Sequence, residues 1–149
     1  MRAVVQRVTE GSVSVENKIV GQIGAGMVVL IGVEDGDTEK DADYIADKVA
    51  GLRIFDDENG VMNISVMDTG GEILSISQFT LLADARKGKR PNYIKAARPE
   101  EANELYKYVN ARLEEKGIHV ETGIFQAEML VNIKNDGPVT ILLDSKKLF

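Results

Sequence analysis

Hydroxyl, amide and aromatic side chains stand together at one point of the sequence, where an apolar segment gives way to a polar one. Ser77, Gln78, Phe79 and Thr80 follow the apolar run 73–76, which predicts a buried strand. A strand fixes the position of the residues at its end, while the loop that follows leaves backbone groups free to bind. This junction is therefore the first candidate for a catalytic site.

The chemistry available to these side chains is narrow. A threonine nucleophile needs a base, and the only histidine, His119, is expected at the start of a strand rather than beside Thr80. The spacing of residues 77–80 is not that of a nucleophile elbow. Equally, these could be ordinary residues at a strand end, with their hydroxyls bonded to backbone and the glutamine in water.

The amino-acid composition excludes several kinds of site. The chain has no cysteine, which rules out disulfides, thiolate catalysis and iron–sulfur clusters. A single histidine rules out a multi-histidine metal site within one chain. We therefore expect no metal and no other cofactor.

A second candidate segment is Asn135-Asp136-Gly137-Pro138, between two predicted late strands. It could be a hairpin turn or a ligand contact. Since only about 5–6% of X–Pro bonds in folded proteins are cis, composition alone favours a trans bond between Gly137 and Pro138. Arg7 stands in an otherwise apolar strand, where a half-buried arginine usually pairs with an acid or a carbonyl oxygen.

Charge is distributed unevenly along the chain. The net charge is −6, yet residues 85–99 contain no acid and carry +6, which leaves −12 for the rest. We call residues 86–98 the basic loop. It could be a solvated loop that aids solubility, but six cations interleaved with glycine, proline and tyrosine favour phosphate binding. The acidic remainder argues against indiscriminate binding of nucleic acid.

Periodicity predicts one α+β domain over residues 1–149, with a mainly antiparallel, barrel-like sheet and two helices. One helix starts after Asp37 or Thr38 and ends near Gly51; the other starts at Pro99 and stops at Gly117. Most links read as tight turns, including 10–11. Strands are expected at residues 2–8, 12–15, 19–23, 27–33, 53–55, 61–66, 73–80, 118–123, 127–134 and 139–144. With no signal peptide and no apolar run long enough to span a bilayer, we expect a soluble cytoplasmic protein with no membrane partner.

The chain resembles the D-aminoacyl-tRNA deacylases, also called D-tyrosyl-tRNA deacylases, essentially from end to end. The segments that carry the resemblance are residues 1–8, 52–55, Ser77-Gln78-Phe79-Thr80-Leu81, 87–91, 122–125 and Asn135-Asp136-Gly137-Pro138-Val139-Thr140. One departure stands out. The resemblance implies Phe-Gly-Ala-Asp-Met where this chain has Phe125-Gln126-Ala127-Glu128-Met129, so that a side chain replaces a glycine where backbone would contact the substrate's terminal adenosine.

The resemblance implies a homodimeric editing hydrolase that removes D-amino acids, and misplaced glycine, from the 3′ end of tRNA. It implies active sites at the subunit interface, with a cis Gly137-Pro138 that reaches into the partner's pocket and is held by Arg7. Phe125 and Met129 would bind substrate. Ser77, Gln78, Phe79 and Thr80 would form the catalytic segment, and Arg86, Lys87, Lys89 and Arg90 would hold the acceptor stem.

An aminoacyl ester on ribose is already activated, and the neighbouring 2′-OH can help to activate water. The enzyme then needs an oxyanion site more than a side-chain base. Backbone N–H groups around Phe79 and Thr80 are the candidates for that site. The main-chain carbonyls of Gly137 and Pro138 would accept bonds from the substrate ammonium and leave no room for an L side chain, while glycine would pass.

Two alternatives stay open at this point. In one, the reaction is the same but Thr80 is a covalent nucleophile. In the other, the protein is a non-catalytic RNA-binding module whose function lies in the basic loop, and residues 77–81 are scaffold.

Overall fold

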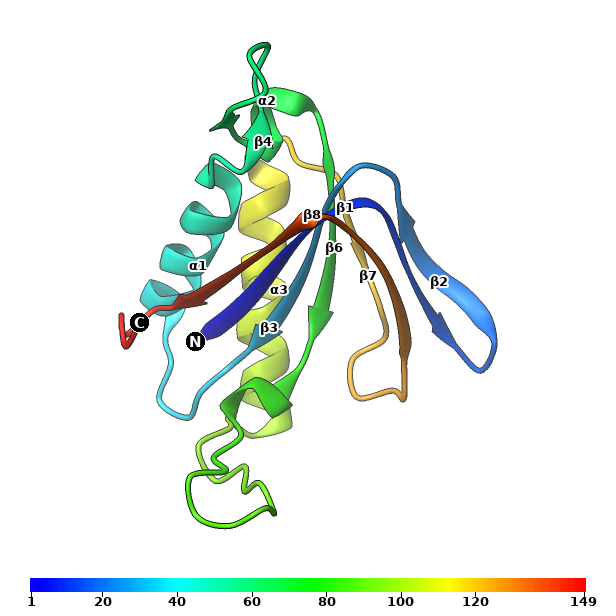
Figure 1. The fold of residues 1–149 in the computed structure, drawn as a ribbon. Coiled ribbons are helices and arrows are strands. Elements are labelled where there is room, and N and C mark those ends of the chain that lie inside the picture. Colours follow the sequence, from blue (N-terminus) through cyan, green and yellow to red (C-terminus); the bar gives the residue numbers. More distant parts are fainter.

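A curved sheet packed against two long helices forms the body of the molecule (Figure 1). The computed structural model describes all residues 1–149. The strands of the main sheet are β1 (Arg2–Val15), β2 (Lys18–Ile23), β3 (Gly26–Gly32), β6 (Glu72–Ser77), β7 (Val120–Thr122) and β8 (Leu130–Asp144), and a separate hairpin consists of β4 (Phe55–Asp56) and β5 (Met62–Ile64). The helices are α1 (Glu39–Gly51), α2 (Val66–Thr69) and α3 (Pro99–Glu115), with a 3₁₀ turn, η1, at Phe79–Leu82. The expected α+β class is confirmed.

The long strand β1 organises the sheet. Its first half pairs with β3, its second half pairs with β2, and β8 runs along its other side, all antiparallel. The pairs β3–β6 and β6–β7 are parallel, so the sheet is mainly antiparallel, as predicted, but contains three parallel strands. Parallel strands need a crossover connection, and the two crossovers contain α1 and α3 respectively.

Two predicted turns are continuous strand. Residues 10–11 lie inside β1, and residues 135–138, the candidate hairpin turn, lie inside β8. The two strands bend together, because their register shifts between Gln6 and Val8 and again between Val8 and Glu10. Irregularities of this kind let a strand absorb glycine and polar residues without reversing direction.

The two predicted helices form where expected. Thr38 begins α1 with a capping box to Asp41, Pro99 occupies the first turn of α3, and Gly117 follows α3 with a φ of 86°. The prediction of only two helices misses α2, a four-residue helix capped by Ser65. The strand predicted at 61–66 is shorter in the structure, where only β5 is strand and α2 begins at Val66.

The core has two parts, one on each face of the sheet. On the helix side, Met27, Val29 and Ile31 of β3 pack with α1 and α3, while Val28 and Leu74 contribute to a smaller cluster inside the curve of the sheet. Both faces of β3 and β6 are therefore covered, as is usual for parallel strands.

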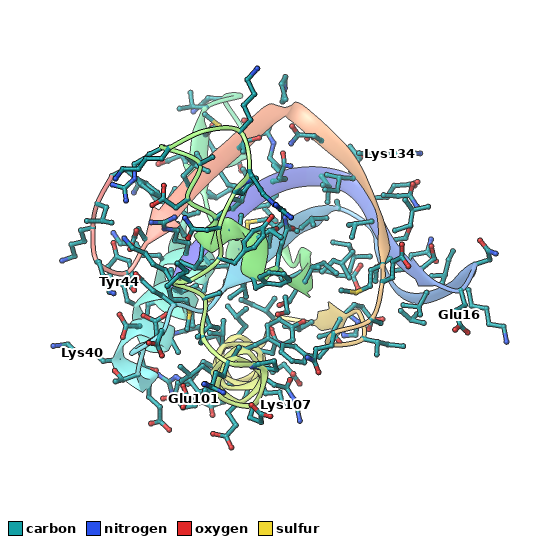
Figure 2. The ribbon with its side chains drawn as sticks, turned by 90° about the horizontal axis from the view of Figure 1, so that it is seen from below. Glu16, Lys40, Tyr44, Glu101, Lys107 and Lys134 are labelled. Carbon is teal, nitrogen blue, oxygen red and sulfur yellow. The ribbon has the colours of Figure 1, made fainter.

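The two ends of the sheet curl toward each other. A Cβ at Gly21 in β2 would lie 2.6 Å from the carbonyl oxygen of Thr122 in β7, so the sheet is a nearly closed barrel. Figure 2 looks nearly along α3 and shows β8 and β1 arching on the opposite side of the molecule. None of the helices combines the length and the hydropathy needed to cross a bilayer.

Candidate active site

A pocket of about 510 Å³ opens where the three parallel strands β3, β6 and β7 end. The carboxyl ends of parallel strands meet at one edge of a sheet, which is where such sheets bind ligands. The start of α3 and the segment after β7 complete the walls. The lining residues are Val33, Ser77, Gln78, Phe79, Thr80, Tyr93, Ala96, Ala97, Pro99, Ala102, Phe125, Gln126, Ala127 and Met129.

The catalytic candidates of the sequence lie together in this lining. Strand β6 stops at Ser77, and residues 79–82 form η1 instead of the predicted continuation of the strand. The Gln78 N–H donates to the carbonyl oxygen of Ile31 in β3 at 2.7 Å, and the Arg2 guanidinium donates to that of Leu81 at 3.0 Å. The turn is therefore held from both β3 and β1.

Gly32 makes this arrangement possible. A Cβ at this position would lie 2.6 Å from Leu82 Cδ2 and 2.9 Å from the carbonyl oxygen of Gln78. The backbone of η1 therefore packs directly on the end of β3, and a larger residue would displace it.

The Thr80 hydroxyl is paired with an amide rather than a base. Gln78 Nε2 donates to Thr80 Oγ1 at 3.0 Å. His119 lies near the amino ends of β6 and β7, the opposite end from the pocket, where its Nε2 is 2.7 Å from a Glu121 carboxylate oxygen. The geometry supplies no imidazole to remove the proton of Thr80.

Two backbone N–H groups lie at the start of η1, those of Phe79 and Thr80. Neither the Phe79 nor the Thr80 N–H donates a backbone hydrogen bond outside the regular helices and strands. The first N–H groups of a helical turn have no partner within the turn. Donors of this kind, fixed by their surroundings, can stabilise a developing oxyanion.

Aromatic rings frame the pocket. Phe79 is 56% exposed and meets Tyr93 edge to face, with ring centroids 5.2 Å apart. On the inner side, the Phe125 ring lies 6.2 Å from that of Tyr106. Tyr106 is buried and its hydroxyl donates to the Ser75 carbonyl oxygen at 2.7 Å, which ties α3 to β6. Burial raises the pKa of Tyr106 above its ordinary value, so it is a neutral donor.

The basic loop projects below the sheet, beside the pocket (Figure 1). Two backbone hydrogen bonds between Asp84 and Asn92 close its base. Arg86 forms a bidentate ion pair with Asp84, at 3.0 and 2.7 Å, and its hydrogen bonds hold the pKa of that carboxyl well below the usual range. The exposed cations that form no ion pair are Lys87, Lys89, Arg90, Lys95 and Arg98.

Gly137 and Pro138 do not line this pocket. Their peptide bond is cis, contrary to the expectation from composition alone, and Gly137 has a φ of 120°. Both residues are exposed on β8. The dipeptide and the 77–80 segment are thus not brought together within one chain.

Arg7 braces the segment that precedes this dipeptide. It is 9% exposed and donates to the carbonyl oxygens of Asp136 at 3.2 Å and Ile54 at 2.8 Å. It also forms ion pairs with Asp136 and Asp56, at 3.4 and 3.7 Å. The Asn135 amide donates to the carbonyl oxygens of Arg7 and Val139, each at 3.0 Å, and so spans the dipeptide from the other side.

Sequence reasoning missed several lining residues. Val33, Tyr93 and the small residues at the start of α3 come from segments far from residue 77. Parallel pairing would have found Val33, since it places the residues after β3 beside those after β6. The positive φ of Gln126, 66°, has no signal in the sequence except the departure from the expected glycine.

The chain is similar to known proteins over its whole length. A family model described as D-Tyr-tRNA(Tyr) deacylase matches residues 4–144. A D-aminoacyl-tRNA deacylase of Desulfitobacterium hafniense is 60% identical over the whole of both chains, and one of Bacillus velezensis is 56% identical over 99% of this chain and 100% of the relative. A solved structure named c-Myc DNA Unwinding Element Binding Protein is 41% identical, covers 97% of this chain and 98% of its own, and has a TM-score of 0.91.

Proposed function

Because the chain belongs to the D-Tyr-tRNA(Tyr) deacylase family, we propose that it hydrolyses the ester of D-aminoacyl-tRNA to a free D-amino acid and tRNA. The observation that carries this proposal is the pocket at the ends of β3, β6 and β7, a cavity of about 510 Å³ that Phe79 and Thr80 line and in which their N–H groups donate no backbone hydrogen bond outside the regular elements. Since the substrate is tRNA, the expected location is the cytoplasm.

The reaction requires few side chains. Water adds to the ester carbonyl carbon, and the carbonyl oxygen takes up negative charge, which the N–H groups of Phe79 and Thr80 stabilise. The carbon–oxygen bond to the ribose then breaks, and the proton released by the water ends on the ribose oxygen. The vicinal ribose hydroxyl relays this proton, so no base near Thr80 is needed.

We propose that the pocket is completed by a second copy of the chain. Strand β8 is 15 residues long and pairs with β1 along one edge only. Its free edge and its exposed Leu130 and Leu142 are suited to strand pairing and apolar contact with another protomer. Gly137 and Pro138 lie on this strand, so a partner's dipeptide, rather than the chain's own, would reach the pocket.

In this arrangement main-chain atoms of the protein discriminate between the D and L forms of the amino acid. The carbonyl oxygens of Gly137 and Pro138 accept hydrogen bonds from the substrate ammonium, and an L side chain would collide with them. The contacts of Arg7 and Asn135 keep this segment in place. Because no contact depends on the side chain of the substrate's amino acid, the enzyme accepts different D-amino acids and also glycine.

The basic loop would bind the acceptor-stem phosphates. Lys87, Lys89 and Arg90 are exposed and free of ion pairs, whereas Arg86 is held by Asp84. The outer surface of α3 carries acids such as Glu101, labelled in Figure 2, and would repel the nucleic acid. The tRNA is thereby directed to the pocket end of the molecule.

The test is release of tyrosine from matched D- and L-tyrosyl-tRNA, measured with metal chelated. We expect hydrolysis of the D-ester only. Binding of tRNA without hydrolysis would instead support the RNA-binding alternative. Substitutions at Gly137 should admit L-tyrosyl-tRNA, and if none does, the chiral selection lies elsewhere. Light scattering at assay concentrations should give the mass of a dimer.

A further inference from the structure

The basic loop is joined to the turn η1 at two places. Along the chain, the loop follows η1 directly, and Asp84 and Asn92 close its base with two backbone hydrogen bonds of 2.9 and 3.0 Å. Through space, the next residue, Tyr93, meets Phe79 at the first position of η1, with ring centroids 5.2 Å apart and ring planes at 72°. Figure 1 shows the loop extending below the sheet from η1. A displacement of the base of the loop therefore also acts on Phe79.

The backbone of Tyr93 is fixed on both sides of its ring. Before it lies the bridge at the base of the loop, and after it the chain pairs with the segment that follows β3. The Asp35 N–H donates to the Lys95 carbonyl oxygen at 2.8 Å, and the Ala97 N–H donates to that of Val33 at 3.0 Å. The Tyr93 hydroxyl forms no hydrogen bond within the chain, so the ring is the part of this side chain that makes the contact.

Tyr93 is the only aromatic partner of Phe79. Both rings are partly exposed, 40% for Tyr93 and 56% for Phe79, and a single aromatic pair is a weak restraint. The loop beyond the pair carries cations that form no ion pair, among them Lys87, Lys89 and Arg90. Their mutual repulsion opposes a compact loop, and phosphates bound between them remove that repulsion. The aromatic pair is therefore held most firmly when the loop is occupied.

We infer that Tyr93 is a positioning residue: it uses the binding of tRNA phosphates at the basic loop to hold Phe79, and so aligns the N–H groups of Phe79 and Thr80 with the ester. This inference rests on the proposed function, in which those N–H groups stabilise the oxyanion. Binding energy from a remote part of a substrate raises kcat when it aligns the groups that act in the transition state. Tyr93 also lines the pocket, so the test separates this role from direct contact with the substrate.

The test compares a long substrate with a short one. D-Tyrosyl-tRNA reaches both the pocket and the basic loop, whereas D-tyrosyl-adenosine is too short to reach the loop. With the wild-type protein, kcat for the tRNA should exceed kcat for the adenosine ester about 2- to 13-fold, the rate equivalent of one aromatic pair. Tyr93→Leu should lower kcat for the tRNA to the level of the adenosine ester and leave KM within about two-fold of wild type.

Two control variants isolate the contribution of the ring. Tyr93→Phe keeps the ring and should behave as wild type, because the hydroxyl has no partner. Tyr44→Leu removes a half-buried tyrosine of α1, labelled in Figure 2, that does not line the pocket. It should change neither kcat nor KM. A direct contact between Tyr93 and the substrate would instead raise KM for both substrates in Tyr93→Leu, and that result would overturn the inference.

A second readout does not depend on hydrolysis. A blunt-ended RNA duplex offers phosphates to the basic loop but has no single-stranded 3′ end that could enter the pocket. In amide NMR spectra, this duplex should shift the signals of Phe79 and Thr80 in the wild type and in Tyr93→Phe. The same signals should stay in place in Tyr93→Leu, because the ring that links the loop to η1 is missing.

Other results would also show the inference to be wrong. They are an equal kcat for the two substrates in the wild type, a kcat ratio that survives in Tyr93→Leu, or duplex-induced shifts of Phe79 and Thr80 that are absent from the wild type or independent of the ring. A wild-type protein that releases tyrosine from neither substrate would instead refute the proposed function. In that case the amide shifts still decide whether Tyr93 links the basic loop to η1.

Discussion

Removing three of the unpaired cations of the basic loop tests how the protein binds tRNA. Lys87, Lys89 and Arg90 are exposed and unpaired, while both ends of the Arg86 guanidinium are engaged by Asp84. We predict that the triple change Lys87→Gln, Lys89→Gln, Arg90→Gln weakens binding of tRNA strongly. Arg86→Gln alone should do so only weakly, because its charge is already neutralised by a neighbour.

The magnitude follows from counterion release. Each lost phosphate contact reduces the slope of log Kd against log salt by roughly 0.7 for single strands and 0.9 for a duplex, so three contacts reduce it by about 2–3. Between 50 and 200 mM salt, the affinity gap between wild type and the triple variant should therefore shrink about 20- to 40-fold. A purely structural effect would leave the gap independent of salt.

Fluorescence anisotropy of labelled tRNA at several salt concentrations measures these slopes. The matched control is Lys18→Gln, Lys40→Gln, Lys107→Gln, which removes the same charge from exposed sites without ion pairs; Lys40 and Lys107 are labelled on the helices in Figure 2. Its slope should equal that of wild type. If the loop variant keeps the wild-type slope, or if the control loses as much, the loop is not the phosphate-binding surface.

Three other changes test the pocket and its support. Thr80→Val should keep kcat/KM within about tenfold in single-turnover assays, whereas a lost covalent nucleophile would lower it on the order of 10⁶-fold, and a trapped acyl-enzyme would likewise favour the nucleophile. Gly32→Ala should lower kcat at least about tenfold and the free energy of unfolding by about 1–3 kcal/mol, because its Cβ would lie 2.9 Å from the Gln78 carbonyl oxygen; normal kcat would mean that the place of η1 is not critical. Tyr106→Phe should lower the free energy of unfolding by about 1 kcal/mol at pH 7. Burial raises the pKa of Tyr106 in the folded state above its ordinary value of 10.0. The wild-type protein therefore loses stability as the pH rises from the pKa of the unfolded state toward that of the folded state. In denaturant titrations above pH 10, the difference in free energy of unfolding between wild type and Tyr106→Phe should narrow, and a difference that stays constant would contradict this.

Local patterns were sufficient to predict the two long helices. Thr38 and Pro99 begin α1 and α3 as their capping preferences predict, since these preferences arise within one turn of backbone. The turns predicted at 10–11 and considered at 135–138 were wrong because glycine and polar residues also occur where paired strands bend. Local sequence alone does not distinguish these cases, whereas the shared register of β1 and β8 does.

The candidate site divides in the same way. The segment 77–80 was found because its polar residues follow an apolar run, a signal that lies within a few consecutive residues. The rest of the lining was missed because it comes from the parallel pairing of β3, β6 and β7, which is a property of the whole chain. The two expected helices already required crossovers long enough for parallel strands, so this part of the topology was open to prediction. The αL conformation of Gln126 was not.

The topology also explains why one protomer holds the two candidate segments apart. The crossovers carry residues 77–80 and 125–129 to the carboxyl edge of the parallel strands, while β8 returns antiparallel along β1 and carries Gly137 and Pro138 away from that pocket. A single chain cannot close this separation without breaking the pairing of β8 with β1. A second copy, paired along the free edge of β8, can supply the dipeptide without any such loss. The direction of the strands is therefore a second argument, besides the exposed apolar residues of β8, for the proposed dimer.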